Sequence, residues 1–343
     1  MTPILHHPPA PAIEHLSVSP AMVEHLLFEI KRLIVGQDHV IERLLVALLA
    51  RGHVLLEGVP GLAKTATIRA LAQVVGGTFG RVQFTPDLIP ADLVGTRIYN
   101  GKTGEFTTEL GPVFVNLLLA DEINRAPAKV QSALLEVMQE RQVTIGKQTH
   151  AVPNPFLVLA TQNPIESEGT YPLPEAQLDR FMFKVIVDYP EYDDEIVVVE
   201  RMLGPEIELR TLITPETLLA MQAAARNVYV DPRVMAYAAA LVNVTRRPAE
   251  QGLEDIAPAV MFGASPRASI NLAVGARALA YVRGRQYVLP QDIADLLPDV
   301  LRHRLVMSYE GLARGVTPDA IIARLLERYP PPRIDLGDRY VAS

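Results

Sequence analysis

Hydrophobic positions change their spacing along the chain, and these changes mark its organisation. From residue 53 to about 190, short apolar runs alternate with segments of helical spacing, which is the pattern of a parallel sheet with helices on both faces. The expected strands are 53–57, 81–85, 116–120, 156–161 and 183–188. Three of them are continuous apolar runs, as strands buried on both faces usually are. The pattern therefore predicts an α/β fold with a parallel five-stranded sheet.

Helical segments flank this region. Before it, one helix begins at Ser19-Pro20 with a single apolar face, and a second follows a break at Val35-Gly36-Gln37. After about residue 212 the strand signal stops. The helices expected there are 215–226, 233–245, 266–282, 290–303 and 318–328. They predict a smaller all-α domain after the sheet.

Two segments break the alternation of strands and helices, and both have the pattern of hairpins. Asn100-Gly101 lies between two strand-like runs, and Gly146-Lys147 lies between two more.

From the pattern of the whole chain we expect a disordered tail at 1–18, a core domain at 19–208 and an all-α domain at 209–343. The two inserts in the core are expected at about 87–110 and about 141–152.

The first strand runs directly into a glycine-containing turn, Gly58-Val59-Pro60-Gly61-Leu62-Ala63-Lys64-Thr65. Such a turn between a strand and a helix can hold a polyphosphate on its backbone N–H groups, with Lys64 at the β/γ oxygens and the Thr65 hydroxyl on Mg²⁺. Ala63 replaces the last glycine of the usual signature. We expect it in the helix-opening turn, where alanine is harmless; a positive φ there would cost roughly 1–2 kcal/mol. The alternative is a turn that binds nothing.

Polar residues follow two other predicted strands. Asp121 and Glu122 end an apolar strand, at the edge where ligands bind to parallel sheets. Asp121 can hold the Mg²⁺ shell while Glu122 acts as general base on the attacking water. Asn163 follows a third strand and is expected between the two motif strands, with its amide orienting water against the γ-phosphate. The alternatives are an acidic loop and an ordinary asparagine before a proline.

Two arginines complete the candidate set. Arg180 lies between a helical turn and the fifth strand, where it can face a neighbouring subunit and stabilise charge on a transferring phosphoryl group. The alternative is a local ion pair with Asp179 or Glu175. Arg267 follows the N-cap Ser265, where its charge opposes the helix dipole at a cost of order 0.3–1 kcal/mol. That position is understandable if the side chain reaches a phosphate, the alternative being a solvated arginine.

Composition narrows the class of protein. The chain of 343 residues is 49% hydrophobic, has no cysteine and carries a net charge of −7. The apolar content is sufficient for a large hydrophobic core. Without cysteine the chain can form no disulfide, thiolate metal site or cysteine nucleophile. Its acidic balance argues against a broad nucleic-acid-binding surface. No apolar run is long enough to span a bilayer and no secretory signal opens the chain, so we expect a soluble, cytoplasmic protein.

Taken together, four blocks resemble the MoxR family of AAA+ ATPases. They are Gly58–Thr65 with alanine at its sixth place, Leu118–Asn124, Ala160–Pro164 and Glu175–Phe181. The resemblance extends from about residue 34 to residue 310. It implies ATP and Mg²⁺ bound at the interfaces of a hexameric ring, with Gly36 and Gln37 completing the nucleotide-binding set.

The resemblance also implies roles for residues outside the loop. Arg180 would be a finger acting in trans, Asn163 a first sensor and Arg267 a second sensor, in cis or in trans. Residues 212–343 would form a lid. Family members usually remodel a protein client, in complex maturation or metal-centre insertion, beside a separate partner with a von Willebrand A domain.

Other functions remain open at this stage. The motor subunit of a metal chelatase is the serious alternative. A nucleic-acid motor is less favoured because of the acidic charge, and an enhancer-binding transcription activator because the loop at Gly101–Phe106 lacks that class's motif. A nucleotide-gated scaffold without turnover is disfavoured by Glu122 and Arg180.

Overall fold

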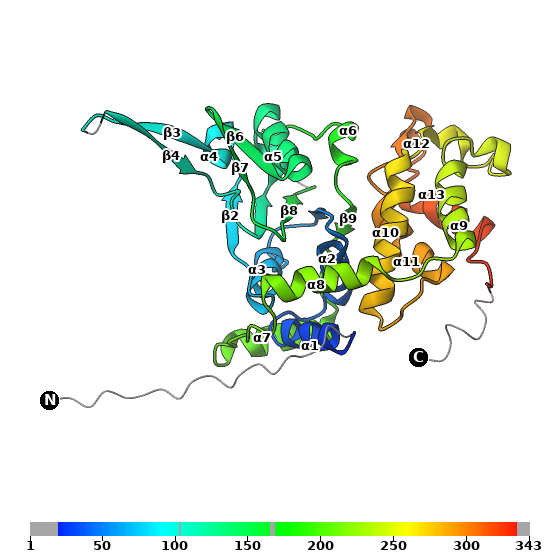
Figure 1. Ribbon diagram of the computed structural model, residues 1–343. Coiled ribbons are helices and arrows are strands. Elements are labelled where there is room, and N and C mark those ends of the chain that lie inside the picture. The colour runs from blue at the N-terminus through cyan, green and yellow to red at the C-terminus, as the bar shows by residue number, and fades with distance from the viewer. Residues whose placement is uncertain (1–19, 103, 165–168, 335–343) are drawn as a thin grey trace.

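The computed structural model describes residues 20–102, 104–164 and 169–334, arranged as an α/β unit beside a helical unit (Figure 1). The tail predicted at 1–18 lies outside the described residues. Within the described part of the chain, no helix combines the length and apolar content that would be needed to cross a bilayer.

A parallel sheet of five strands forms the centre of the first unit, as predicted. Its order is β2-β5-β8-β1-β9. The strands are β1 (Val54–Glu57), β2 (Phe79–Gln83), β5 (Leu117–Asp121), β8 (Leu157–Gln162) and β9 (Phe183–Ile186). Each overlaps a predicted strand. The order places β8 between β1 and β5, so the segments that follow these three strands meet at one edge of the sheet.

Alternate side chains of the strands enter two different apolar clusters. In β1, Val54 and Leu56 belong to one cluster and Leu55 to the other, and all three are fully buried. Burial on both faces explains why these strands are continuous apolar runs. The helices of this unit are α1 (Pro20–Lys31), α2 (Asp38–Ala50), α3 (Lys64–Val74), α4 (Pro90–Val94), α5 (Ala128–Glu140), α6 (Glu175–Leu178) and α7 (Tyr192–Leu203), with the 3-10 turn η1 (Ile123–Arg125).

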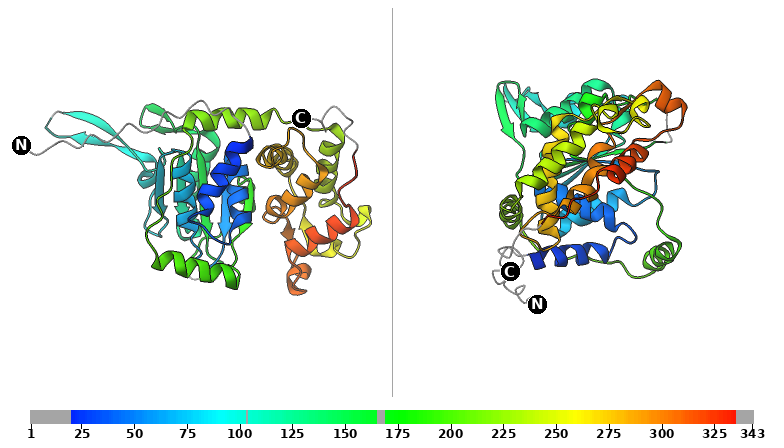
Figure 2. Two further views of the ribbon diagram at one scale, coloured as in Figure 1. Left: turned by 90° about the horizontal axis from the view of Figure 1, so that it is seen from below. Right: turned by 90° about the vertical axis from the view of Figure 1, so that its right-hand side faces the viewer.

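Both predicted hairpins are present. One is formed by β3 (Gly95–Asn100) and β4 (Glu105–Leu110), the other by β6 (Gln142–Ile145) and β7 (Gln148–Ala151). The β3–β4 hairpin projects well beyond the body of the α/β unit in two views (Figures 1 and 2). Near its end, the exposed Tyr99 and Phe106 pack against each other with ring centroids 5.1 Å apart and ring planes inclined by 53°.

The second unit is largely helical. Its helices are α8 (Pro215–Arg226), α9 (Pro232–Val244), α10 (Pro266–Val282), α11 (Pro290–Leu301), α12 (Tyr309–Ala313) and α13 (Pro318–Arg328), with the 3-10 turns η2 (Ala249–Gln251) and η3 (Ala257–Ala259). Proline follows the N-cap of α10 and α13, and Ser265 and Thr317 cap these helices as expected. A short antiparallel pair, β10 (Val260–Phe262) with β11 (Val306–Met307), is an addition to the predicted helices.

Buried ion pairs join the two units. Arg43 of α2 donates from Nε to Asp299 Oδ2 of α11 at 2.7 Å, and both side chains are almost fully buried. Arg43 also donates to the main-chain oxygen of Asp295 at 2.9 Å. An arginine buried this deeply depends on such partners, because an unpaired buried charge is strongly destabilising. The helical unit is therefore anchored on α2.

Candidate active site

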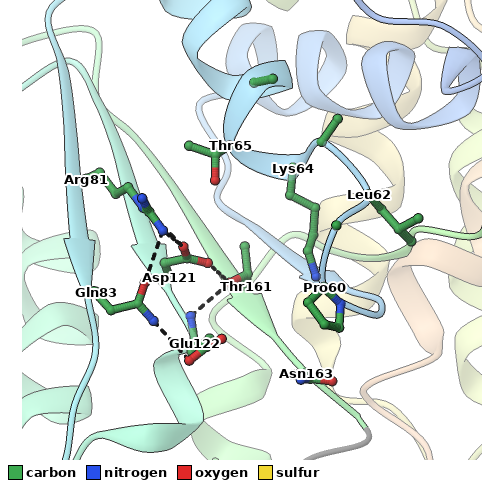
Figure 3. Close-up of a pocket in the computed structure, with 13 residues that line it drawn as sticks. Pro60, Leu62, Lys64, Thr65, Arg81, Gln83, Asp121, Glu122, Thr161 and Asn163 are labelled. Carbon is green, nitrogen blue, oxygen red and sulfur yellow. Dashed lines mark hydrogen bonds and ion pairs between the residues drawn. The ribbon is translucent and has the colours of Figure 1, made fainter. Parts of the chain in front are cut away.

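A cavity of about 460 Å³ lies at the carboxyl edge of the sheet (Figure 3). It brings together the turn after β1, the two carboxylates that end β5 and the residues that follow β8. Its lining consists of Pro60, Gly61, Leu62, Ala63, Lys64, Thr65, Ala66, Arg81, Gln83, Asp121, Glu122, Thr161 and Asn163. The structure therefore gathers most of the predicted site residues around one space.

The glycines of the turn serve two different purposes. A Cβ on Gly58 would lie 2.5 Å from the main-chain oxygen of Val187, so only glycine fits this close approach. Gly61 has φ +87°, a conformation that glycine adopts without strain. Lys64 opens α3 and donates from Nζ to the main-chain oxygen of Gly58. Burial lowers the pKa of Lys64, an effect that Asp121 and Glu122 partly oppose.

The expectation for Ala63 was wrong. Ala63 is the N-cap of α3 and has φ +53° and ψ +18°, in the left-handed region. An alanine there costs roughly 1–2 kcal/mol relative to a right-handed conformation. Ala63 directly precedes Lys64, the first residue of α3, so the left-handed conformation lies where the chain enters the helix. The alanine is thus a strained residue in the wall of the cavity.

Asp121 is held by two residues from the neighbouring strands. Thr161 of β8 donates from Oγ1 to Asp121 Oδ1 at 2.6 Å. Arg81 of β2 donates to Asp121 Oδ2 at 2.6 Å through one terminal nitrogen, and at 3.2 Å through Nε. These bonds fix the orientation of the carboxylate, and its remaining lone pairs can still accept from a ligand.

Glu122 has a strained backbone and a fixed side chain. Its φ of +57° places it in the left-handed region, where non-glycine residues are uncommon and often functional. Its amide donates to Thr161 Oγ1 at 2.8 Å, and its Oε2 accepts from Gln83 at 2.9 Å. Arg125 lies 3.0 Å from the same oxygen. Gln83 and Arg125 therefore orient the carboxylate at the cavity, while Thr161 holds the backbone of the same residue.

Three of these neighbours were missed at the level of sequence, namely Arg81, Gln83 and Thr161. Arg81 and Gln83 are two positions apart on β2, so their side chains lie on a common face. Which strand lies beside that face is a property of sheet order, and the sequence pattern does not contain it. Asn163 is buried, follows β8 between β1 and β5, and lines the cavity.

A second cavity, of about 800 Å³, adjoins the first and shares Gly61, Leu62, Ala63, Thr65 and Ala66 with it. Its further lining is mostly apolar and comes from the segment after α1, from α3 and from α7. Gln37 lines it and donates from Nε2 to the main-chain oxygen of Leu62 at 2.8 Å. Gly36 lines neither cavity; it has φ +70°, and a Cβ there would lie 2.7 Å from Asp194 Oδ2.

The two predicted arginines lie outside both cavities. The Arg180 guanidinium makes no hydrogen bond or ion pair with the described residues, so the local pair with Asp179 or Glu175 is not formed there. Asp179 turns instead to the second unit, where its Oδ2 lies 3.2 Å from Arg267 and its Oδ1 2.8 Å from Arg304. Arg267 is half-exposed and lies beside Asp179 rather than at the phosphate turn.

Comparison with known proteins agrees with this arrangement. Residues 53–183 match the family described as the ATPase family associated with various cellular activities (AAA), and residues 253–325 match the AAA lid domain. The chain is 53% identical to Chaperone MoxR1 of Mycobacterium tuberculosis over 96% of this chain and 88% of the relative. It is 34% identical to Protein MoxR of Methylorubrum extorquens over 89% of this chain and 93% of the relative.

A solved structure extends the likeness to three dimensions. A crystal structure of an inferred ATPase from Cytophaga hutchinsonii superposes with a TM-score of 0.86 at 46% sequence identity. The match covers 92% of this chain and 96% of the other. Since both units are included, the α/β unit and the helical unit share their fold with this relative.

Proposed function

The chain belongs to the MoxR family of AAA+ ATPases, and from this premise we propose that it hydrolyses ATP to ADP and phosphate at sites completed by a neighbouring subunit. One observation carries the proposal. The phosphate turn, both carboxylates and Asn163 line one cavity, whereas Arg180 lies outside it with an unpaired guanidinium among the described residues. A hydrolytic site of this composition lacks only a cation opposite the γ-phosphate.

The nucleotide occupies both cavities in this proposal. Its phosphates lie in the smaller, polar cavity, where backbone N–H groups of the turn and the start of α3 face the anion. Lys64 leaves the main-chain oxygen of Gly58 and moves to the β/γ oxygens. The adenine base fills the larger, mostly apolar cavity beside Gln37, since flat aromatic rings favour such a lining.

Thr65 and Asp121 are the residues that would hold Mg²⁺. Both line the smaller cavity, and hydroxyl and carboxylate oxygens are the donors that this ion prefers. Asp121 would support the ion with the lone pairs that Thr161 and Arg81 leave free. When bound, the ion would neutralise charge on the phosphate oxygens.

Glu122 acts as the general base. Its fixed carboxylate accepts a proton from the attacking water while the water oxygen bonds to the γ-phosphorus. The bond from the γ-phosphorus to the β–γ bridging oxygen breaks in the same step, and ADP leaves with that oxygen. Gln83 and Arg125 hold the side chain in place before the reaction. The Asn163 amide positions the water or the γ-phosphate from the neighbouring strand.

Arg180 of one subunit stabilises the phosphoryl charge in the next. A heterologous ring contact brings this edge of one copy to the cavity of another. Arg267 shares the edge through Asp179, so we infer that it too acts in trans. The ring is a hexamer in this proposal, as the family resemblance implies.

The work driven by ATP is remodelling of a protein client in the cytoplasm. The family resemblance supports this role, and so does the name of the chaperone relative. The exposed apolar and aromatic tip of the β3–β4 hairpin offers a surface for an unfolded segment. A separate protein with a von Willebrand A domain is the proposed partner, acting in complex maturation or metal-centre insertion.

Two measurements test the function. Phosphate release with purified protein, ATP and Mg²⁺ tests the reaction, with Lys64→Ala as the inactive control. Affinity purification from the source organism then tests the partner. Recovery of a von Willebrand A protein supports the remodeller, whereas recovery of chelatase subunits alone would replace it with a metal chelatase motor.

A further inference from the structure

Three consecutive residues of the helical unit bind the main chain on both sides of Arg180. Arg302 donates to the main-chain oxygen of Lys184 at 2.7 Å. His303 Nε2 lies 3.1 Å from the main-chain oxygen of Phe181. Arg304 makes the largest number of bonds to this segment. The finger is thus carried by a stretch of the α/β unit that the helical unit holds in place.

Arg304 donates hydrogen bonds to the backbone on both sides of Arg180. One terminal nitrogen donates to the main-chain oxygens of Asp179 at 3.0 Å and Phe181 at 2.6 Å, the two carbonyls that flank Arg180. The other terminal nitrogen donates to Met182 at 3.3 Å and to Val300. Nε donates to Asp179 Oδ1 at 2.8 Å. The planar guanidinium thereby uses all three of its nitrogens, which a lysine could not do.

Arg304 is buried as well as fully bonded, so this contact is shielded from water. The residue is 5% exposed. Burial lowers its pKa to about 10, against the opposing effect of Asp179, so it keeps its charge at neutral pH. A buried charge with this many partners has one favourable geometry, and it fixes the backbone from Asp179 to Met182. The Arg180 guanidinium, by contrast, bonds to none of the described residues, and the residue is partly exposed.

Asp179 extends the same contact to Arg267. Its carboxylate accepts from Ser265 Oγ at 3.0 and 3.1 Å, and from Arg267 at 3.2 Å. Ser265 is also the N-cap of α10. Arg267 is therefore tied to the carboxylate of the residue that directly precedes Arg180, and the same carboxylate is tied to Arg304.

We propose that Arg304 is a positioning residue for the trans finger: it locks the Asp179–Met182 backbone so that Arg180 and Arg267 present a fixed pair of cations to the neighbouring subunit's phosphates. The proposal rests on the shared site described above. A displacement of about 1 Å in such a group can cost about a hundredfold in rate. Loosening Arg304 therefore lowers kcat in the neighbour's site while leaving nucleotide affinity in its own subunit unchanged.

The variant Arg304→Lys tests this, because it keeps the charge and removes most of the donors. We expect kcat to fall by about tenfold to a hundredfold, with nucleotide Kd unchanged within about threefold. Arg285→Lys is the matched control, since Arg285 also pairs with a buried aspartate of the helical unit, Asp292 at 2.5 Å. That control keeps parental turnover. An equal loss of kcat in both variants would overturn the proposal, because it would mean general damage to the helical unit.

Mixed rings separate positioning from loss of structure. An Arg304→Lys subunit keeps an intact cavity, and a Glu122→Gln subunit keeps an intact finger edge. In an equal mixture, about one interface in four joins that cavity to that edge, so the mixture hydrolyses ATP faster than the two variants do separately. No gain from this mixture, while Arg180→Ala mixed with Glu122→Gln does gain, would overturn the role of Arg304.

The same mixtures distinguish the role of Arg304 from the shared active site on which it rests. If Arg180→Ala also fails to gain activity with Glu122→Gln, the shared site itself is wrong.

Should thermal melting show that Arg304→Lys does not fold, Asp179→Asn takes its place, because it removes the carboxylate partner of Arg304 and leaves the four carbonyl contacts. Asp179→Asn is expected to lose turnover alone and regain it with Glu122→Gln, and failure to regain it would equally overturn the proposal.

Discussion

The Thr161 hydroxyl donates to Asp121 Oδ1 at 2.6 Å and joins the ends of two adjacent strands. The same hydroxyl oxygen accepts from the Glu122 amide at 2.8 Å. One side chain therefore fixes both the proposed metal-shell carboxylate and the backbone of the proposed base. It does so at the one strand that lies between the phosphate turn and the two acids.

Replacing this hydroxyl should damage the site without unfolding the protein. Thr161→Val keeps the shape but removes the donor and acceptor, and losses of this kind commonly cost about 10–100-fold in activity. We expect kcat to fall by that factor with little change in nucleotide Kd. Thr161→Ser keeps the hydroxyl and should retain most of the turnover. Equal activity of the valine and parental proteins, measured by phosphate release, would remove this role from Thr161.

Glu122→Gln tests the general base. The amide is similar in size and cannot accept the proton, so we expect turnover to fall by about 10²–10⁴-fold. Nucleotide binding, followed by titration with a fluorescent ATP analogue, should remain, and ATP-bound rings should become more stable. Hydrolysis at the parental rate would show that another group activates the water.

Arg180→Ala tests the finger. Its removal should lower kcat by about 10³–10⁵-fold while leaving the affinity of the subunit's own cavity nearly unchanged. Arg324→Ala, which removes a surface arginine paired with Asp255 on the helical unit, is the control and should keep its activity. Loss of nucleotide binding in Arg180→Ala would point to a structural role instead.

Ala63→Gly should relieve strain in the phosphate turn. The substitution removes the strain of an alanine in the left-handed region, which is roughly 1–2 kcal/mol. It also gives the unfolded chain more conformational freedom, which destabilises the folded state by about 0.5–1 kcal/mol. The expected result is a net gain of about 0.5–1 kcal/mol in unfolding free energy, with ATP binding retained. Ala70→Gly, in the interior of α3, should instead destabilise by about 1 kcal/mol. A loss of stability in Ala63→Gly, measured by urea unfolding, would contradict the strain argument.

Stability should depend on pH through His53. Burial, with the nearby Arg141 charge, lowers the pKa of His53 from 6.5 to about 3. Below pH 6.5 the unfolded chain binds a proton at this histidine and the folded protein does not, so stability present above pH 6.5 is lost as the pH falls toward 3. The expected slope is about 1.4 kcal/mol per pH unit.

Urea unfolding at pH 7 and pH 5 measures this effect. His53→Gln should shrink the difference between the two pH values by about 2 kcal/mol, since the titrating group is gone. Exposed His25→Gln serves as the control and should leave the difference unchanged. An unchanged difference in His53→Gln would mean that His53 is not held neutral by the fold.

The sequence was informative where one residue type satisfies one local demand. Glycine at 58 and 61, the lysine after the turn and the apolar strand ending in Asp121 and Glu122 each follow from local geometry and charge. The prediction failed at Ala63, because backbone reversal depends on how α3 joins the turn and not on the identity of the residue. Alanine offers no local signal for a positive φ.

Contacts that depend on the order of strands could not be predicted in this way. Thr161 and Arg81 reach Asp121 only because β8 and β2 lie on either side of β5. Arg304 meets Asp179 across 125 positions of sequence, and no spacing pattern connects them. Which charged residues become buried likewise depends on how the two units pack, so it could not be predicted from the sequence pattern.

The central claim is that each active site is completed across a subunit interface. The most direct test is the steady-state ATPase rate per subunit as a function of protein concentration, with sedimentation velocity on the same samples. We predict a rate per subunit that rises as monomers assemble and becomes constant once rings predominate. A constant rate from a monomer would contradict the shared site, and with it the role of Arg180.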